Sequence, residues 1–136
     1  MKKLLLAFIA IPLISFSQSS VYGVDPFNGN LEVMDTTTFT VTNVGLTSGL
    51  GAVTGCNGLS DDGMGNLYVV YKISGISPRH LGTLDVSTGA ITDVGALSDN
   101  IATIAFDGSG TLYGVTGDGA AVTETMYTIN LSLIHI

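Results

Sequence analysis

Residues 58–68 read GLSDDGMGNLY, and residues 103–113 read TIAFDGSGTLY. Both stretches place an Asp-Gly turn before a strand that opens with Leu-Tyr, and they lie 45 residues apart. An earlier partial copy, VYGV at residues 21–24, places Tyr22 46 residues before Tyr68. Self-similarity at a fixed period is the signature of repeat architectures. The sequence therefore predicts three like units, marked by Tyr22, Tyr68 and Tyr113.

A second element repeats downstream of each tyrosine. Residues 81–95 (LGTLDVSTGAITDVG) align without gaps on residues 31–45 (LEVMDTTTFTVTNVG), and a third copy begins at residues 126–130 (MYTIN). The extra residues of the second unit fall near residues 73–80, where we expect a surface loop, because loops tolerate insertions. Gly89 can take the positive φ that closes a hairpin turn, whereas Phe39 stands at the matching place in the first unit. That turn must either differ or strain a bulky residue.

Val, Thr and Gly are frequent, and no segment after residue 17 has a helical period. Short strands bounded by turn residues are predicted at 20–25, 30–35, 40–44, 66–72, 79–86, 90–94, 101–106, 111–116 and 125–130. In the middle unit Leu67, Val69 and Tyr71 alternate with Tyr68 and Val70, so both faces of that strand are apolar. A sheet needs two apolar faces when it lies between two other sheets, as the blades of a propeller do. We therefore predict an all-β fold: a partial β-propeller of about three incomplete, four-stranded antiparallel blades over residues 18–130.

The first 17 residues are typical of a secretory signal peptide. Two lysines precede an apolar run at residues 4–14, and Ser15-Phe16-Ser17 supplies small residues for cleavage after Ser17. The run is too short for a membrane span, which needs about 20 residues. We expect residues 1–17 to be removed, with no transmembrane segment afterwards. The predicted location is secreted, periplasmic or on the cell surface.

The last six residues, LSLIHI at 131–136, interrupt the repeat where Thr-Gly and a strand are expected. They resemble the in-frame translation of an adapter used in preparing sequencing libraries. The sequence thus favours a non-native tail at 131–136 and a natural protein that is longer. A short C-terminal strand is the alternative.

Charge narrows the range of partners. All 11 acidic residues follow the predicted cleavage point, where Lys72 and Arg79 are the only cations, which gives a formal charge of −9. Such a surface repels nucleic acid and anionic lipid, so we expect no nucleic-acid partner. Cys56 is the only cysteine, and we interpret it as a small buried apolar residue.

No catalytic, cofactor-binding or metal-binding residue is assigned from the sequence. Asp61, Asp62 and Asp107 offer oxygen ligands for Ca²⁺, but they lack the spacing of an EF-hand loop and suit β-turns equally well. His80 is interpreted as a surface-loop residue, and His135 belongs to the suspect tail. There is no G-x-S-x-G elbow, Walker loop, dinucleotide fingerprint or Cys/His cluster. The three tyrosines are predicted to pack between units rather than to stack against sugars.

The Leu-Tyr, Thr-Gly and Val-Gly motifs, at 67–68, 112–113, 88–89, 44–45 and 94–95, resemble those of secreted bacterial β-propellers of the YVTN/NHL-like, lactonase-like or quinoprotein-like kind. The resemblance implies the architecture and not an activity. Regular repeats without a catalytic constellation favour a binding or scaffold module with a carbohydrate or protein ligand over an enzyme. An alternative is a metal-dependent, lactonase-like hydrolase, in which carboxylates from several blades hold one metal. A purely structural extracellular repeat is a third. Fold resemblance alone does not choose between them.

Overall fold

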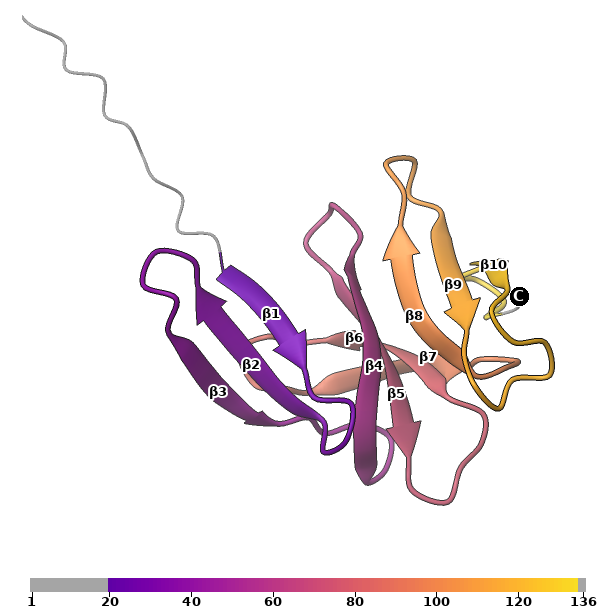
Figure 1. Ribbon diagram of the computed structural model, residues 1–136, viewed down its shortest axis with the longest axis horizontal. Coiled ribbons are helices and arrows are strands. Elements are labelled where there is room, and N and C mark those ends of the chain that lie inside the picture. Colours follow the sequence, from indigo (N-terminus) through magenta and orange to yellow (C-terminus); the bar gives the residue numbers. More distant parts are fainter. Residues whose placement is uncertain (1–19, 135–136) are drawn as a thin grey trace, which may run out of the picture.

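A computed structural model describes residues 20–134, so the predicted signal peptide at 1–17 and residues 135–136 lie outside the described part. The described chain forms ten strands in three antiparallel sheets and contains no helix (Figure 1). The first sheet comprises β1 (Ser20–Val24), β2 (Asn30–Asp35) and β3 (Val41–Leu46). The second comprises β4 (Val53–Asp61), β5 (Leu67–Ile73), β6 (His80–Leu84) and β7 (Ile91–Ala96). The third comprises β8 (Ile101–Phe106), β9 (Leu112–Thr116) and β10 (Met126–Ile129). The all-β prediction is confirmed, and the three sheets stand in a row without closing into a ring.

The predicted strand ranges match nine of these strands and omit β4. This strand contains Gly55, Asn57 and Gly58, which are poor strand formers. Two of its glycines have a packing reason. A Cβ at Gly55 would lie 2.2 Å from the carbonyl oxygen of Pro26, and a Cβ at Gly58 would lie 2.7 Å from Cα of Thr103. Local propensity is overridden here because the backbones of both neighbouring sheets pass close to β4.

Positions matched in the sequence have the same strand pairing. Tyr22, Tyr68 and Tyr113 lie opposite Val33, Thr83 and Thr128 respectively. Leu31 pairs with Gly45 and Leu81 with Gly95, and in both cases a β-bulge follows directly. The predicted Val-Gly ends of the units are therefore the bulged ends of β3 and β7.

The Asp-led hairpin turns also match, including the one that carries a bulky residue. Asp35 and Asp85 each accept backbone hydrogen bonds on Oδ1, and their carbonyls accept the amides of Phe39 and Gly89. Gly89 has φ 74°, and Phe39 has φ 56°. The sequence left open whether this turn differs or strains a bulky residue. The turn at Asp35 has the same geometry as the turn at Asp85, so Phe39 is held in the left-handed region, which costs an L residue about 1 kcal/mol.

Asn130 forms the same turn and holds the amides of Ser132 and Leu133. The structure thus describes residues 131–134 as a turn, and their predicted foreign origin stays a prediction.

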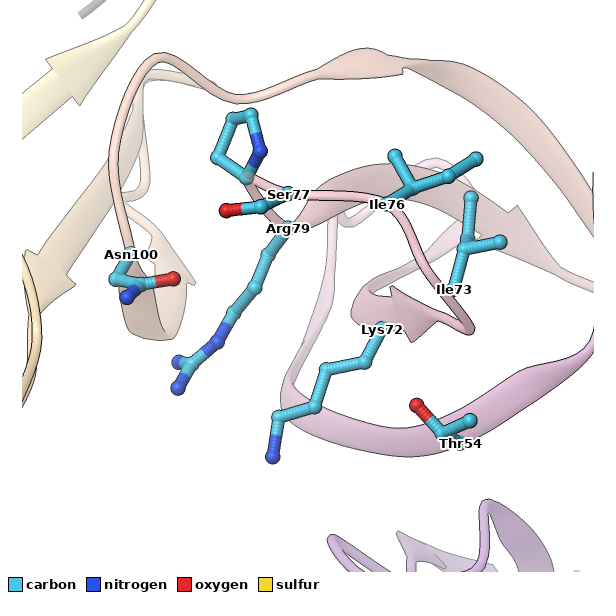
Figure 2. A pocket seen from close by; sticks show the side chains of 8 residues that line it. Thr54, Lys72, Ile73, Ile76, Ser77, Arg79 and Asn100 are labelled. Atoms are coloured by element: carbon cyan, nitrogen blue, oxygen red, sulfur yellow. The ribbon is translucent and has the colours of Figure 1, made fainter.

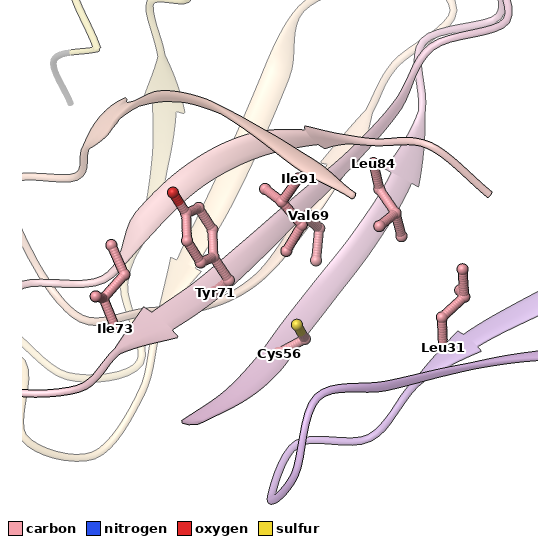
Figure 3. Packing of buried hydrophobic residues seen from close by; sticks show 7 residues of the cluster. All are labelled: Leu31, Cys56, Val69, Tyr71, Ile73, Leu84 and Ile91. Atoms are coloured by element: carbon pink, nitrogen blue, oxygen red, sulfur yellow. The ribbon is translucent and has the colours of Figure 1, made fainter. Parts of the chain in front are cut away.

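Two apolar cores lie between the sheets. The first, shown in Figure 3, joins Leu31 of the first sheet to Val69, Tyr71 and other residues of the second. The other core joins Val70 and Leu81 of the second sheet to buried residues of the third. The prediction that β5 has two buried apolar faces is confirmed. Tyr22 packs against the first core and Tyr68 against the other, where its ring centroid lies 5.1 Å from that of Phe106.

Candidate functional site

The Asp-Gly loops that offered Ca²⁺ ligands are hydrogen-bonded turns. Asp62 Oδ1 accepts the amides of Met64 (2.8 Å) and Asn66 (3.0 Å), and Asp62 Oδ2 accepts Nδ2 of Asn66 (2.6 Å). Asp107 Oδ1 accepts the amides of Ser109 and Thr111, both at 2.9 Å. These bonds hold the pKa of each carboxyl below its ordinary value, with the side chains of Asn66 and Ser109 as the largest causes.

Asp61 Oδ1 likewise accepts the amide of Gly63 at 2.5 Å. Within residues 20–134 no three His, Cys, Asp or Glu side chains gather in a way that could hold a metal ion. The geometry of these loops is that of hydrogen-bonded turns.

His80 is not a surface-loop residue, and this interpretation is corrected. It is the first residue of β6, and only 8% of its surface is exposed. Nδ1 of His80 lies 2.9 Å from Oδ1 of Asp93, and the hydroxyl of Tyr71 donates to the same oxygen at 2.5 Å. The three side chains link β5, β6 and β7, so we call them the Tyr-His-Asp cluster.

A glycine makes this cluster possible. Tyr71 is fully buried, and its ring must pass over β6 to reach Asp93 on β7. Gly82 lies on β6 along that path, and a Cβ there would meet Cε1 of Tyr71 at 3.2 Å and Cγ2 of Ile91 at 2.4 Å. Sequence reasoning missed the cluster because Tyr71 and Asp93 are 22 residues apart in different strands and match no linear motif.

The chemistry of the cluster is that of a structural link. Burial, and then the hydrogen bond to Asp93, raises the pKa of the Tyr71 phenol well above its ordinary value. The phenol therefore stays protonated at neutral pH and serves as a hydrogen-bond donor.

A cavity of about 270 Å³ opens beside the loop that joins β5 to β6 (Figure 2). Its polar lining consists of Thr54, Lys72, Ser77, Arg79 and Asn100. Ile73, Ile76 and Pro78 form its apolar wall. The lining comes from the start of β4, the end of β5, the connecting loop and the residue before β8. The cavity is therefore shared by the second and third sheets.

The cavity gathers positive charge from an acidic chain. Lys72 and Arg79 are the only cations among residues 20–134, which also contain 11 carboxylates. Nη1 of Arg79 donates to the carbonyl of Ile101 at 2.6 Å, and burial lowers the pKa of this guanidinium. Within residues 20–134 the one basic side chain at salt-bridge distance from a carboxylate is His80, beside Asp93, so no carboxylate is paired with Lys72 or Arg79. The sequence signal for this cavity is that Lys72 and Arg79 lie at the two ends of one predicted loop.

Cys56 is buried, as predicted, with 1% of its surface exposed. Its Sγ lies 3.5 Å from Oγ1 of Thr47, and burial raises the pKa of the thiol. A raised pKa keeps the thiol protonated and inert.

Over the described residues, no helix has the length and apolar character needed to cross a membrane. A scan against models of known protein families and a search among curated proteins find no match to this chain.

Proposed function

We propose that this chain is part of an exported β-propeller that acts as a binding or scaffold module. The support comes from the three sheets, which share strand pairing at matched positions and bury matched faces against one another. A protein that repeats one sheet presents its loops in a fixed arrangement, and binding residues tend to lie on such loops.

The observation that carries the proposal is the uncovered outer face at each end of the row. Val21 matches Leu67, whose side chain packs in the first core, yet 51% of Val21 is exposed. Val41 of β3 lies on the same face, with Met34 of β2 between it and Val21, and is 56% exposed. At the other end Tyr113 matches Tyr68, and Met126 of the same sheet is 66% exposed. Further sheets of the same kind would cover both faces, as the two cores already do within the row.

The uncovered faces give a first test. We expect the chain to self-associate in analytical ultracentrifugation, and Val41→Lys to weaken that association while leaving the thermal midpoint of unfolding unchanged. Thr38→Lys adds the same charge on an exposed turn and serves as the control. A wild-type chain that remains monomeric at high concentration would argue against the need for neighbouring sheets.

The binding role is tested separately. Glycan and protein arrays probed with the protein are expected to retain at least one carbohydrate or protein partner. An array that retains nothing would count against a binding module.

A further inference from the structure

We propose that the cavity beside the β5–β6 loop binds the carboxylate of a sugar-sized ligand, and that Lys72 and Arg79 supply the positive charge. This inference rests on the proposed binding function and names its ligand class.

The geometry provides donors of the right kind. In Figure 2 the ammonium of Lys72 and the guanidinium of Arg79 extend into the same space, with Asn100 near Arg79 and Thr54 near Lys72. Arg79 uses one N–H on the carbonyl of Ile101, which anchors the planar group and leaves other N–H donors for a ligand. A planar guanidinium fork matches the two oxygens of a carboxylate.

The matching loop of the third sheet lacks both cations. Twelve residues lie between Tyr68 and Leu81, and twelve lie between Tyr113 and Met126, so the two loops align without a gap. At the places of Lys72 and Arg79 the third unit has Gly117 and Glu124. The cations are therefore a feature of the second unit and not of the repeat, which is the pattern expected of residues kept for binding.

The loop of the third sheet is also held differently. Both carboxylate oxygens of Asp99 accept the amide of Ala121 at 3.1 Å, and Nδ2 of Asn100 donates to the carbonyl of Gly119 at 3.0 Å. The residue that matches Asp99 in the second unit is Thr54, which instead lines the cavity. The second unit thus has an open cavity where the third has a carboxylate that ties down its loop.

The charge and size of the surroundings select among anions. A formal charge of −9 over residues 20–134 repels a polyanion, whereas a single carboxylate feels mainly the two nearby cations. A volume of about 270 Å³ lies just below the usual range of ligand pockets, which begins at about 300 Å³, and so limits the ligand to the size of a single sugar. Hydroxyl and amide groups beside an apolar wall of Ile76 and Pro78 suit a ring with hydroxyls and C–H faces.

The test is equilibrium dialysis of the full chain against labelled D-glucuronate, D-glucose and inorganic sulfate. We expect saturable binding of glucuronate and at least tenfold weaker binding of glucose and of sulfate. Lys72→Gln and Arg79→Gln should each lower the affinity for glucuronate about tenfold, because each removes a charge-assisted hydrogen bond. Glu124→Gln changes one charge at the matching place in the third sheet and is expected to leave the affinity unchanged.

Two results would overturn the inference: equal affinity for glucose or sulfate, or unchanged glucuronate affinity in Lys72→Gln. The lysine variant decides the matter even if Arg79→Gln destabilises the fold through loss of the bond to Ile101, and circular dichroism verifies that each variant is folded. A glycan array that retains neutral glycans with wild type and both variants alike would uphold the binding module and reject this ligand. An array without any partner, together with no binding in dialysis, would reject both.

Discussion

The second and third sheets place a small residue at the same cross-strand pair, but on opposite strands. Val69 pairs with Gly82 across β5 and β6, whereas Gly114 pairs with Tyr127 across β9 and β10. The small residue has moved from one strand to the other. In the second sheet Gly82 leaves room for the ring of Tyr71, and in the third sheet the residue matching Tyr71 is the small Thr116.

The polar links at the ends of these strands differ accordingly. In the second sheet Tyr71 and His80 meet on Asp93. In the third sheet the matching pair is Thr116 and Thr125, and the amide of Thr125 donates directly to Oγ1 of Thr116 at 3.0 Å. Matched positions are therefore paired alike in both sheets, while the hydrogen bonds at the loop end are made by different residues in each sheet.

The largest expected effect comes from filling the space at Gly82. Gly82→Val places side-chain atoms against Ile91 and Tyr71 in the first core, and overpacking of this kind lowers the free energy of unfolding by about 3 kcal/mol. Urea denaturation followed by circular dichroism measures the change. Gly108→Ala is the control, because nothing lies within 4 Å of its added Cβ. Equal stability of Gly82→Val and wild type would show that the ring of Tyr71 does not need this gap.

A smaller loss is expected from Tyr71→Phe, which keeps the ring and removes the donor to Asp93. A hydrogen bond to a charged acceptor contributes about 1.5 kcal/mol, and Asp93 would keep only His80 as a partner. The control is Tyr127→Phe, since no hydroxyl partner is found for Tyr127 within residues 20–134. If both variants lose the same stability in urea denaturation, the Tyr-His-Asp cluster contributes nothing specific.

The raised pKa of Tyr71 predicts that the free energy of unfolding depends on pH in the alkaline range. The folded-state pKa of Tyr71 is raised, so the native state holds its proton where an unfolded chain has begun to lose it. The free energy of unfolding should therefore fall as the pH rises above about 10, the ordinary value for tyrosine. Ultraviolet titration should show a phenol that ionises well above the ordinary value, and this transition should be absent in Tyr71→Phe. An unaltered titration curve in that variant would contradict the raised pKa.

In these two sheets the strands could be predicted from the sequence, whereas the contacts between sheets could not. The Asp-Gly and Val-Gly signals located most strands to within two residues, because turn chemistry is local and was read directly from the chain. β4 was not predicted because its glycines are required by contacts with the backbones of neighbouring sheets, at Pro26 and Thr103. Such contacts leave no pattern in the local sequence. His80 was misplaced and the cavity was missed for the same reason, since Asp93 and Asn100 reach them only through the assembled sheets.

The smallest expected effect carries the comparison to the first sheet, at the turn that holds Phe39. Phe39 has φ 56° and is 73% exposed, so its ring gains little burial while its backbone occupies a conformation that favours glycine. Phe39→Gly should raise the free energy of unfolding by about 0.5 kcal/mol, because relief of about 1 kcal/mol of strain is partly offset by the greater entropy of glycine in the unfolded chain. The reciprocal change Gly89→Ala, at φ 74°, should lower it. Thermal denaturation of the pair measures both signs, and a loss of stability in Phe39→Gly would mean that the exposed ring makes a contact worth more than the strain, as it would if another sheet covered this end of the row.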